Sequence, residues 1–356
     1  MLKKTPLFDE EVQLGARFTE FAGWELPLYY SGIIDEHMAV RSSAGIFDIS
    51  HLGKISINGQ GSAEFLQSLV PIDINKISIG RGAYTVFCNE DGRIIDDDIL
   101  YRFDEREFFV VANASRLRTL LNWFTEHKLP EVEVKDHTDE LCLLALQGPG
   151  SPELLKRIFN EDSGLYKQYT VRNVVINGNK ITVMKSGYTG EEGYEIVADP
   201  ETAKRAWRLF LDAGVKPVGI GARDTLRLEM GYPLYGQDLT TETTPLEAGL
   251  GWLISFEKGY FIGKEALLKQ KEEGVGRKII GFILDHGIAR GGERLFTTLG
   301  EEIGSVTSGG YSPVLKRGIG MAYVLSSYTQ TGMDIKIQKA GKELVGRLTN
   351  RPFIKK

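Results

Sequence analysis

Three consecutive acids lie in the middle of a strand-like stretch, Arg93 to Phe103 (RIIDDDILYRF). Because side chains alternate between the two faces of a strand, Asp97 shares its face with apolar side chains, whereas Asp96 and Asp98 lie on the other. A carboxylate on an apolar, inward face is costly unless it is paired or hydrogen-bonded. Asp97 is therefore our candidate for a functional acid. A hydrogen-bonded structural acid, or a register shift toward either neighbour, is the alternative.

An amide is expected next to this acid. The tight polar turn at residues 104–106 (DER) separates the first stretch from a second strand-like run, residues 107–113, and predicts a hairpin. If the hairpin turns at Glu105, Asn113 comes opposite Asp97. An amide beside an inward acid favours a polar ligand pocket.

Two further stretches carry polar residues in unusual settings. Residues 186–197 (SGYTGEEGYEIV) contain three glycines in seven positions, which lets the backbone pack closely against a flat group, and Glu195 enters a strand between apolar neighbours. An ordinary glycine-rich turn is the alternative there.

Residues 221–230 (GARDTLRLEM) have the composition of a helix opened by glycine, with Arg223 in its first turn. The helix dipole disfavours a cation at that end, which predicts a carboxylate or a ligand as the partner of Arg223.

The sequence lacks the motifs of several common classes of enzyme. Residues 219–224 (GIGARD) lack the third glycine of a dinucleotide fingerprint, and residues 259–265 lack both the spacing and the Ser or Thr of a phosphate loop. No GxSxG run marks a serine hydrolase. We therefore expect no nucleotide cofactor.

Metal and disulfide chemistry are not expected either. The five histidines are His37, His51, His127, His137 and His286. None of them falls at the i, i+4 spacing of a helical zinc site, so each is expected at the surface or in a structural role. Cys88 and Cys142 are far apart in sequence, and we expect two partly buried thiols in strands.

Composition and charge exclude other classes of function. The chain has 356 residues, 42% apolar and 26% charged, with a net charge of −5. This length allows two or three domains, and the charge leaves no surplus of Lys and Arg for binding nucleic acid. The longest apolar run, Leu141 to Leu146, is far short of the ~20 residues that span a bilayer, and no export signal appears. We expect a cytoplasmic protein that binds neither nucleic acid nor membranes.

Glycine divides the chain into short elements and predicts mixed α and β structure. A helix is expected over residues 31–45, with Ser31 as its cap and Ile34, Met38 and Arg41 at helical spacing. Residues 51–138 predict the β-α-β-β-α-β order of a ferredoxin-like domain. Its elements are expected at Gly53–Asn58, Ser62–Leu69, Arg93–Phe103, Glu107–Asn113, Ser115–His127 and near Val132.

Strands and helices alternate over residues 139–245, where the clearest helix is Thr202–Asp212. From Arg277 onward the chain changes to short strands broken by Gly, Pro and Ser, which predicts a small all-β barrel. Its strands are expected at Ile279–Leu284, Glu302–Ser308, Gly318–Leu325 and Asp334–Ile337.

Taken together, these stretches resemble the glycine cleavage T-protein family. The likeness runs through residues 5–8 (TPLF), 21–24 (FAGW), 41–51 (RSSAGIFDISH), 92–97, 187–195 (GYTGEEGYE), 221–229 (GARDTLRLE), 234–238 (LYGQD), 261–265 and 307–313. It therefore covers effectively the whole chain. The resemblance implies an α+β protein, a three-domain ring with folate in a central cavity. The implied domains are residues 1–50 plus 139–245 (discontinuous α/β), 51–138 (ferredoxin-like), 246–276 (a connecting segment) and 277–356 (the β-barrel).

The resemblance also implies a function: a tetrahydrofolate-dependent aminomethyltransferase of glycine catabolism and one-carbon metabolism. Lipoylated H-protein delivers an aminomethyl group, ammonia leaves, and the carbon passes to tetrahydrofolate as the 5,10-methylene derivative, with neither metal nor nucleotide. The family's catalytic acid falls on Asp97, although Asp98 stands where the family usually has an apolar residue. Its pterin-holding acid falls on Glu195 and its helix arginine on Arg223.

Other positions match the lining of the family's folate cavity. They are Tyr84, Tyr101, Asn113, Tyr188, Tyr232 and Leu52. Leu52 stands where relatives often carry methionine, a volume-conserving change. Arg290, near a glycine-rich loop of the barrel, is our candidate for contact with an acidic surface of H-protein, and an ordinary solvated arginine is the alternative.

Two alternative functions stay open within the resemblance. One is a folate-dependent demethylase of the same family, acting on a small S-methyl or N-methyl substrate. Relatives that oxidise N-methyl amines carry a flavin domain, for which this chain has neither the length nor the motif. The other is a non-catalytic folate-binding factor for iron–sulfur protein maturation, whose Lys-Gly-Cys signature is absent from this sequence.

Overall fold

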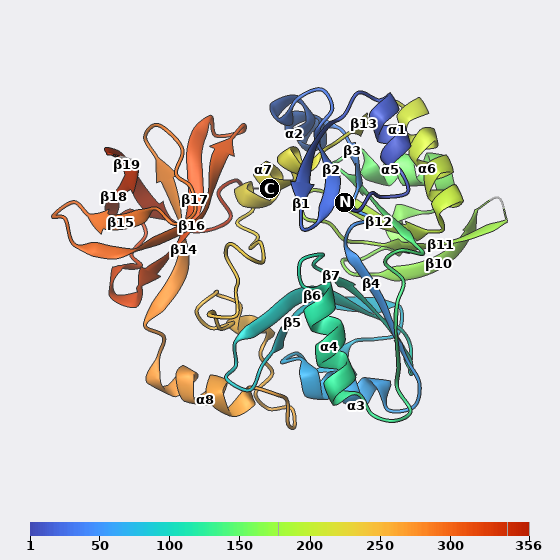
Figure 1. Cartoon of the computed structure of the whole chain (residues 1–356), viewed down its shortest axis with the longest axis horizontal. Coiled ribbons are helices and arrows are strands. Elements are labelled where there is room, and N and C mark those ends of the chain that lie inside the picture. Colours follow the sequence, from blue (N-terminus) through green and yellow to red (C-terminus); the bar gives the residue numbers. More distant parts are fainter. Residues whose placement is uncertain (177, 340, 356) are drawn as a thin grey trace. The chain divides into compact units, whose positions relative to one another are not determined.

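The computed structural model describes residues 1–176, 178–339 and 341–355 (Figure 1). Contacts between Cα atoms divide the chain into two compact units. The first comprises Met1–Ser68, Asp73–Thr85 and Asp97–Arg223, and the second comprises Leu69–Ile72, Val86–Asp96 and Asp224–Lys356. None of the described helices is long and apolar enough to cross a membrane.

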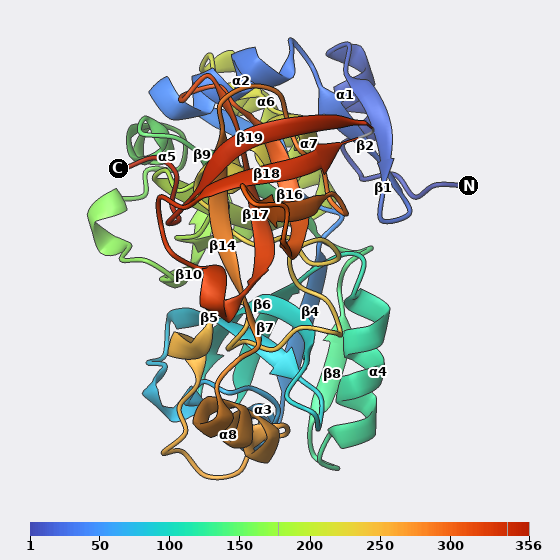
Figure 2. The same cartoon turned by 90° about the vertical axis from the view of Figure 1, so that its left-hand side faces the viewer.

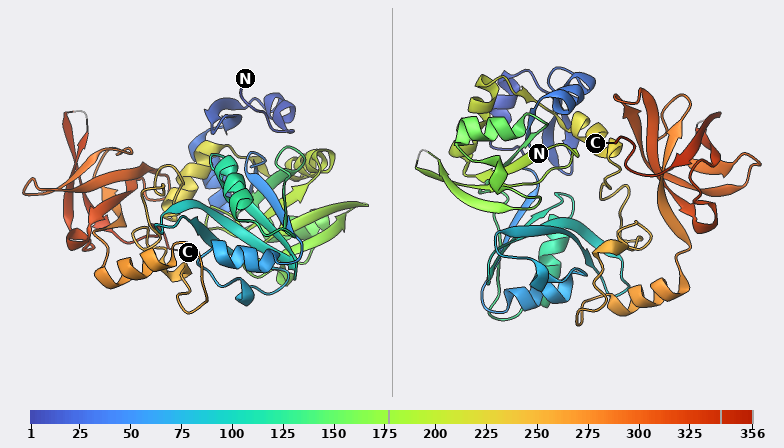
Figure 3. Two further views of the ribbon diagram at one scale, coloured as in Figure 1. Left: turned by 60° about the horizontal axis from the view of Figure 1, so that its bottom comes forward. Right: turned by 180° about the vertical axis from the view of Figure 1, so that it is seen from behind.

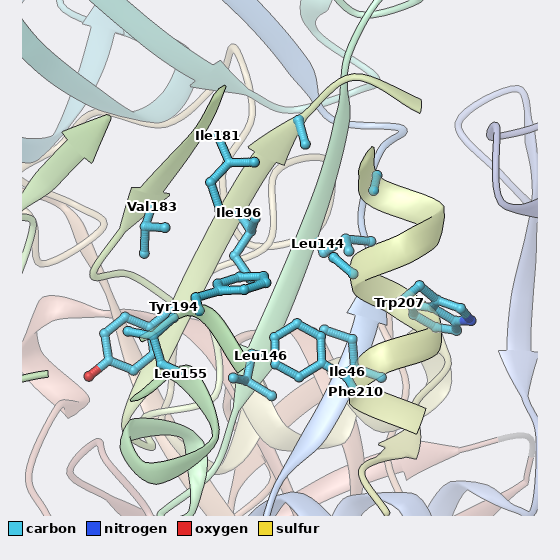
Figure 4. Packing of buried hydrophobic residues seen from close by; sticks show 14 of the residues in the cluster. Ile46, Leu144, Leu146, Leu155, Ile181, Val183, Tyr194, Ile196, Trp207 and Phe210 are labelled. Atoms are coloured by element: carbon cyan, nitrogen blue, oxygen red, sulfur yellow. The ribbon is translucent and has the colours of Figure 1, made fainter. Parts of the chain in front are cut away.

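A six-stranded sheet forms the core of the first unit, in the order β10-β11-β12-β9-β3-β13. Its strands are β3 (Gly45–Asp48), β9 (Cys142–Gln147), β10 (Val171–Ile176), β11 (Asn179–Met184), β12 (Gly193–Ala198) and β13 (Lys216–Pro217). Helices α5 (Ser151–Phe159) and α6 (Pro200–Asp212) pack on it, and Figure 4 shows Leu155 of α5 and Phe210 of α6 beside Ile46 and Leu146 of the strands. Every residue of β9 is buried because β9 is paired on both sides and covered.

Helix α6 confirms the expected helix near Thr202. Asp199 caps its N-terminus by accepting a hydrogen bond from the Thr202 backbone N–H at 3.0 Å, and Pro200 occupies the first turn. A hairpin of β1 (Arg17–Phe21) and β2 (Trp24–Tyr29) and the short helix α1 (Phe8–Gln13) complete the N-terminal part of this unit.

The ferredoxin-like pattern is also confirmed, with one strand added. The sheet order is β5-β6-β7-β4-β8, from β4 (Gly53–Asn58), β5 (Arg81–Cys88), β6 (Ile94–Asp104), β7 (Glu107–Ala112) and β8 (Glu133–Asp136). Helices α3 (Ser62–Leu69) and α4 (Leu117–His127) lie on one face of it (Figure 1), and the rings of Phe65 and Phe124 meet edge to face at 5.8 Å. Strand β5 was missed, although its second half, residues 84–88 (YTVFC), is rich in β-formers.

The barrel is confirmed as a closed six-stranded sheet in the order β14-β17-β16-β15-β18-β19 (Figures 2 and 3). Its strands are β14 (Arg277–Leu284), β15 (Arg294–Thr297), β16 (Glu302–Ser312), β17 (Arg317–Leu325), β18 (Asp334–Lys339) and β19 (Lys342–Thr349). Closure leaves no unpaired strand edge, and Phe282, Leu295 and Ile335 are among the fully buried side chains of its core. Strands β15 and β19 were not predicted from the sequence. Helix α7 (Ile220–Glu229) and helix α8 (Lys264–Glu273) precede the barrel in the chain.

The helix expected over residues 31–45 is shorter and is capped differently. Helix α2 spans Ile33–Ser42, and Ile34 is 55% exposed, so the proposed apolar stripe does not face the core. The buried Glu36 carboxylate accepts the backbone N–H groups of Tyr30 and Ser31 at 2.6 and 2.8 Å, so Ser31 is not the cap. The Ser31 hydroxyl instead donates to Asp35 at 2.5 Å.

Candidate active site

Asp97 lies in β6 with two polar partners. The Tyr84 hydroxyl donates to Asp97 Oδ2 at 2.8 Å, and Asn113 Nδ2 donates to Asp97 Oδ1 at 3.0 Å and to its backbone carbonyl at 2.9 Å. The hairpin register pairs Ile99 with Val111, which brings Asn113 opposite Asp97. The expected acid–amide pair is therefore confirmed, and Tyr84 adds a third member from the missed strand β5.

The expectation that the Asp97 face is the inward face of β6 is wrong in part. Asp97 is half-buried, whereas Asp96 and Asp98 are 0% and 2% exposed. Strand register places Asp98 in one row with Gly53 of β4, and a side chain at Gly53 would come within 2.8 Å of Leu117 in α4. The helices therefore cover the Asp98 face. Alternation along one strand reveals two faces but not which of them a helix will cover.

The glycine-rich loop (residues 186–193) folds around one buried amide. The Thr189 hydroxyl donates to Gln147 Oε1 at 2.8 Å. A Cβ atom on Gly187 or Gly193 would lie 1.9 or 2.2 Å from the Gln147 side chain. The glycines therefore make room for the flat amide of Gln147, in agreement with the expected close packing.

An ion pair fixes the same loop from α2. Arg41 Nη1 donates to the Thr189 carbonyl at 2.6 Å and pairs with Glu191 at 3.0 Å. The Arg41 and Glu191 side chains are only 7% and 10% exposed. The anchored loop holds the Tyr188 ring against the Arg223 guanidinium, whose Cζ lies 5.0 Å from the ring centroid.

Glu195 and Arg223 each affect the pKa of the other. Glu195 lies in β12 and is 4% exposed, and Arg223 lies in the first turn of α7. Burial raises the pKa of Glu195 and the charge of Arg223 opposes that rise. Burial likewise lowers the pKa of Arg223, and Glu195 opposes that fall. The expected carboxylate therefore acts on Arg223 through its charge, without a direct hydrogen bond from Arg223 Nη1.

Four buried polar atoms around this pair lack hydrogen-bond partners among the described residues. They are Glu195 Oε2, Arg223 Nη1, Tyr101 Oη and Ser186 Oγ. The Ser186 hydroxyl is near enough to lower the pKa values of Tyr101 and Glu195, although it does not meet the geometry of a hydrogen bond to either. Buried polar groups are almost always satisfied, so this group of acceptors and donors suits a flat polar ligand. Ser186 was missed, although it is the first residue of the glycine-rich loop.

The turn after β3 adds His51 and Leu52. His51 is 3% exposed, and burial, with the charges of Arg223 and Lys54, lowers its pKa to about 3. Leu52 is half-buried, and the Lys54 ammonium donates to the carbonyls of Ser50 and Leu52, both at 2.7 Å. His51 was expected only in a surface or structural role. Its place in the RSSAGIFDISH run was the available signal.

Tyr232 and Arg290 belong to the second unit. Tyr232 is half-buried in the loop after α7, where its backbone N–H donates to the Arg227 carbonyl at 3.0 Å. Arg290 is exposed between β14 and β15 and donates to the Gly309 carbonyl at 2.7 Å. A cavity of about 420 Å³ borders it. The other residues lining this cavity are Asp224, Gly236, Gln237, Gly291, Gly292, Val306, Thr307 and Gly309.

No cluster of three His, Cys, Asp or Glu side chains within residues 1–176, 178–339 and 341–355 could hold a metal ion. Cys88 in β5 and Cys142 in β9 are free and buried, as expected from the sequence. Burial raises the pKa of both thiols to about 12, so both are inert at neutral pH.

Comparisons with known proteins cover the whole chain. Residues 7–258 match the family model described as the GCVT N-terminal domain, and residues 277–355 match the glycine cleavage T-protein C-terminal barrel domain. The aminomethyltransferase of Halothermothrix orenii is 43% identical over 99% of this chain and its own full length. That of a Thermoanaerobacter species is 42% identical over 100% of this chain and 98% of its own. The crystal structure of the glycine cleavage system aminomethyltransferase T from Bartonella henselae superposes with a TM-score of 0.93 at 34% identity, covering 99% of this chain and 98% of that one. The chain therefore belongs to the glycine cleavage T-protein family.

Proposed function

We propose that this chain is the cytoplasmic aminomethyltransferase of a glycine cleavage system. It takes the aminomethyl group carried on a sulfur of the lipoyl arm of H-protein and transfers its methylene carbon to tetrahydrofolate. The C–S and C–N bonds break, and two new C–N bonds to folate nitrogens form. The products are 5,10-methylenetetrahydrofolate, ammonia and dihydrolipoyl H-protein.

The observation that supports this proposal most strongly is the set of unsatisfied buried atoms around Glu195 and Arg223. A pterin edge offers adjacent N–H donors, which one carboxylate accepts in bidentate fashion, and a ring carbonyl, which a guanidinium can bind. In this assignment Glu195 accepts the N–H donors, Arg223 binds the carbonyl and keeps Glu195 ionised, and Tyr188 packs on the flat ring. Tyr101 and Leu52 are assigned to the walls of the same site.

Asp97 is assigned the role of the acid–base group. Its two hydrogen bonds, from Tyr84 and Asn113, hold the carboxylate in one orientation. A fixed carboxylate can accept a proton or a hydrogen bond from a folate nitrogen, which makes that nitrogen a better nucleophile. It can also stabilise the positive charge that develops on the transferred group. Tetrahydrofolate supplies the two nitrogens that accept the carbon.

The second substrate is proposed to arrive on a protein. Lipoylated H-protein is the partner expected for this family, and the exposed Arg290 is assigned to its docking surface. No metal and no nucleotide is assigned a part in the reaction.

A direct assay tests the proposal. Purified protein is mixed with aminomethylated H-protein and tetrahydrofolate, and ammonia and 5,10-methylenetetrahydrofolate are measured together. We expect both products in equal amounts, with little ammonia when folate is left out. Saturating tetrahydrofolate should also raise the melting temperature through preferential binding to the folded state, and Glu195→Ala should abolish most of that rise. Absence of both products, or a demethylated small substrate in their place, would contradict the assignment.

A further inference from the structure

The buried carboxylate of Glu36 lies where the N-terminal ends of two helices meet. Glu36 belongs to the first turn of α2 and is 0% exposed. Its Oε1 accepts the backbone N–H groups of Tyr30, Ser31 and Gly32 at 2.6, 2.8 and 3.1 Å. Its Oε2 accepts the backbone N–H of Gly219, directly before α7, at 2.9 Å. One side chain therefore joins two segments that are 183 residues apart in the chain.

The negative charge of Glu36 suits this position. The N-terminal end of a helix carries a partial positive charge, and here the ends of α2 and α7 both direct backbone N–H groups at one carboxylate. A buried carboxylate is costly unless hydrogen bonds replace those of water, and four N–H donors do so here. Glu36 therefore stabilises the N-terminal ends of both helices at once.

The start of α7 packs tightly on the segments that Glu36 holds. The backbone N–H of Val218 still donates to a carbonyl of β3, at 2.9 Å, and the chain then turns into the helix. A Cβ atom on Gly219 would lie 2.4 Å from the Leu28 carbonyl oxygen, and one on Gly221 would lie 2.7 Å from the Ile33 side chain. The backbone at residues 219–221 therefore rests directly on the end of β2 and the start of α2.

Consecutive hydrogen bonds lead from Glu36 to the backbone of Arg223. Glu36 Oε2 accepts the Gly219 N–H, and the Gly219 carbonyl accepts the Arg223 N–H at 3.2 Å in the first turn of α7. The guanidinium at the end of this side chain lies 5.0 Å from the centroid of the Tyr188 ring and carries the buried Nη1 described above. A shift or rotation of this turn would therefore move the guanidinium relative to the ring and to any ligand bound there.

From these contacts we infer that Glu36 is a positioning residue for the proposed reaction. By fixing the start of α7, it holds the Arg223 guanidinium in place for folate, and it acts through Arg223. The part of this inference that concerns folate rests on the proposed function. The anchoring of α7 does not, because it depends on hydrogen bonds within the free protein.

Glu36→Gln separates the two sides of this contact. The amide oxygen can still accept the three N–H groups before α2, but the amide nitrogen then faces the Gly219 N–H, so that two donors meet without an acceptor. We expect the variant to fold, with the amides of residues 219–223 exchanging hydrogen at least about tenfold faster than in the wild type. Exchange followed by mass spectrometry measures this, and β9 should exchange at its wild-type rate. Unchanged exchange at residues 219–223 would overturn the inference.

A double-mutant cycle tests the link to Arg223, with tetrahydrofolate titrated under argon in a calorimeter. Glu36→Gln should raise the Kd about tenfold in the wild-type background, because the guanidinium is no longer held in place. In the Arg223→Met background the same substitution should raise the Kd by less than about twofold. The melting temperature should fall equally in both backgrounds, since the same hydrogen bond is lost. An equal factor on Kd in both backgrounds would indicate a purely structural role and would overturn the inference.

Two further variants complete the test. Glu36→Asp keeps the charge but withdraws the carboxylate from Gly219, and it is expected to give the same pattern if the glutamine variant folds poorly. Asp35→Asn is the matched control on the same helix, because Asp35 is exposed and pairs with Lys216 of β13 at 2.6 Å. Its Kd should stay within about twofold of the wild-type value. Wild-type protein that binds no folate would contradict the proposed function, while hydrogen exchange would still decide whether Glu36 anchors α7.

Discussion

Two arginines one turn apart on α7 have opposite surroundings. Arg227 is 1% exposed, and its guanidinium donates to Asp238 at 2.8 Å, to Asp224 at 2.9 Å and to the Ser308 hydroxyl at 3.0 Å. Arg223 is half-buried, with Nη1 fully buried and lacking a hydrogen-bond partner among the described residues. Its interactions are the charge of Glu195 and the ring of Tyr188.

The difference separates a structural charge from one kept for a ligand. A buried cation surrounded by carboxylates and hydroxyls is satisfied by the fold itself, and removing it leaves its partners unpaired. A guanidinium with a buried N–H donor that lacks an acceptor can satisfy that donor only when a ligand binds. The same contrast separates Asp238, which accepts four hydrogen bonds around its carboxylate, from Glu195, whose Oε2 accepts none from the described residues.

The most direct test of this contrast replaces one carboxylate with an amide in the candidate active site and another in the buried ion pair of Arg227. Asp97→Asn should lower the single-turnover transfer rate by about 10²–10⁴, the usual range for a positioned acid–base group, and leave folding intact. Asp238→Asn should instead lower the free energy of unfolding by about 3 kcal/mol, because it weakens a buried ion pair. Rapid-quench kinetics and urea unfolding measure the two effects.

The neighbours of Asp97 provide the controls. Asp96→Asn and Asp98→Asn should reduce the transfer rate far less than Asp97→Asn does. Because the Asp96 and Asp98 side chains are both buried, we expect these substitutions to lower mainly the stability of the protein. A transfer rate lower in Asp96→Asn than in Asp97→Asn would mean that the catalytic carboxylate has been assigned to the wrong residue.

The two arginines themselves give the next largest effects. Arg227→Met should lower the free energy of unfolding by about 3–5 kcal/mol, since it leaves Asp238 buried without its cation. Arg223→Met should change stability little but weaken folate binding by roughly 10–100-fold, the value of one or two hydrogen bonds to a charged group. Urea unfolding and calorimetry on both variants test this. If both variants lost mainly stability, the comparison between them would fail.

The acid stability of a His51 variant shows whether water is excluded from the His51 side chain in the free protein. Its folded-state pKa of about 3 lies below the usual 6.5, so the unfolded chain binds the proton first and stability is lost as the pH falls below 6.5. Between pH 6.5 and 5 the loss should be about 2 kcal/mol, and His51→Gln should remove it. The exposed His286→Gln serves as control. An unchanged acid profile in His51→Gln would indicate that His51 is hydrated.

The smallest effect is expected on the exposed surface of the barrel. Arg290→Glu should raise the KM for H-protein by about threefold at low salt, with the effect lost at high salt, because exposed charges act mainly on association and are screened. Arg294→Glu, an exposed position on β15, is the matched comparison. Equal KM values for both variants would remove Arg290 from the docking surface.

Local patterns in the sequence were sufficient for most elements and for the centre of the site. Alternation along β6 and the length of the turn that follows it placed Asn113 opposite Asp97, because strand register in a hairpin is set by the turn. The glycines at 187 and 193 indicated a close backbone approach, and Arg223 at a helix start indicated a carboxylate partner. In each case the relevant neighbours are close in sequence or dictated by backbone geometry.

Tertiary packing alone decided the rest. Whether helices cover the Asp97 face or the Asp98 face of β6 depends on where α3 and α4 pack, and no alternation within one strand contains that information. Glu36, not Ser31, satisfies the backbone before α2, because a buried carboxylate that reaches several N–H groups competes with a nearby hydroxyl. Glu11 of α1 and Asp48 of β3 are both buried, although the sequence around each gives no sign of it. Charges buried by distant segments change their proton affinity through desolvation, which exists only once the fold has excluded water.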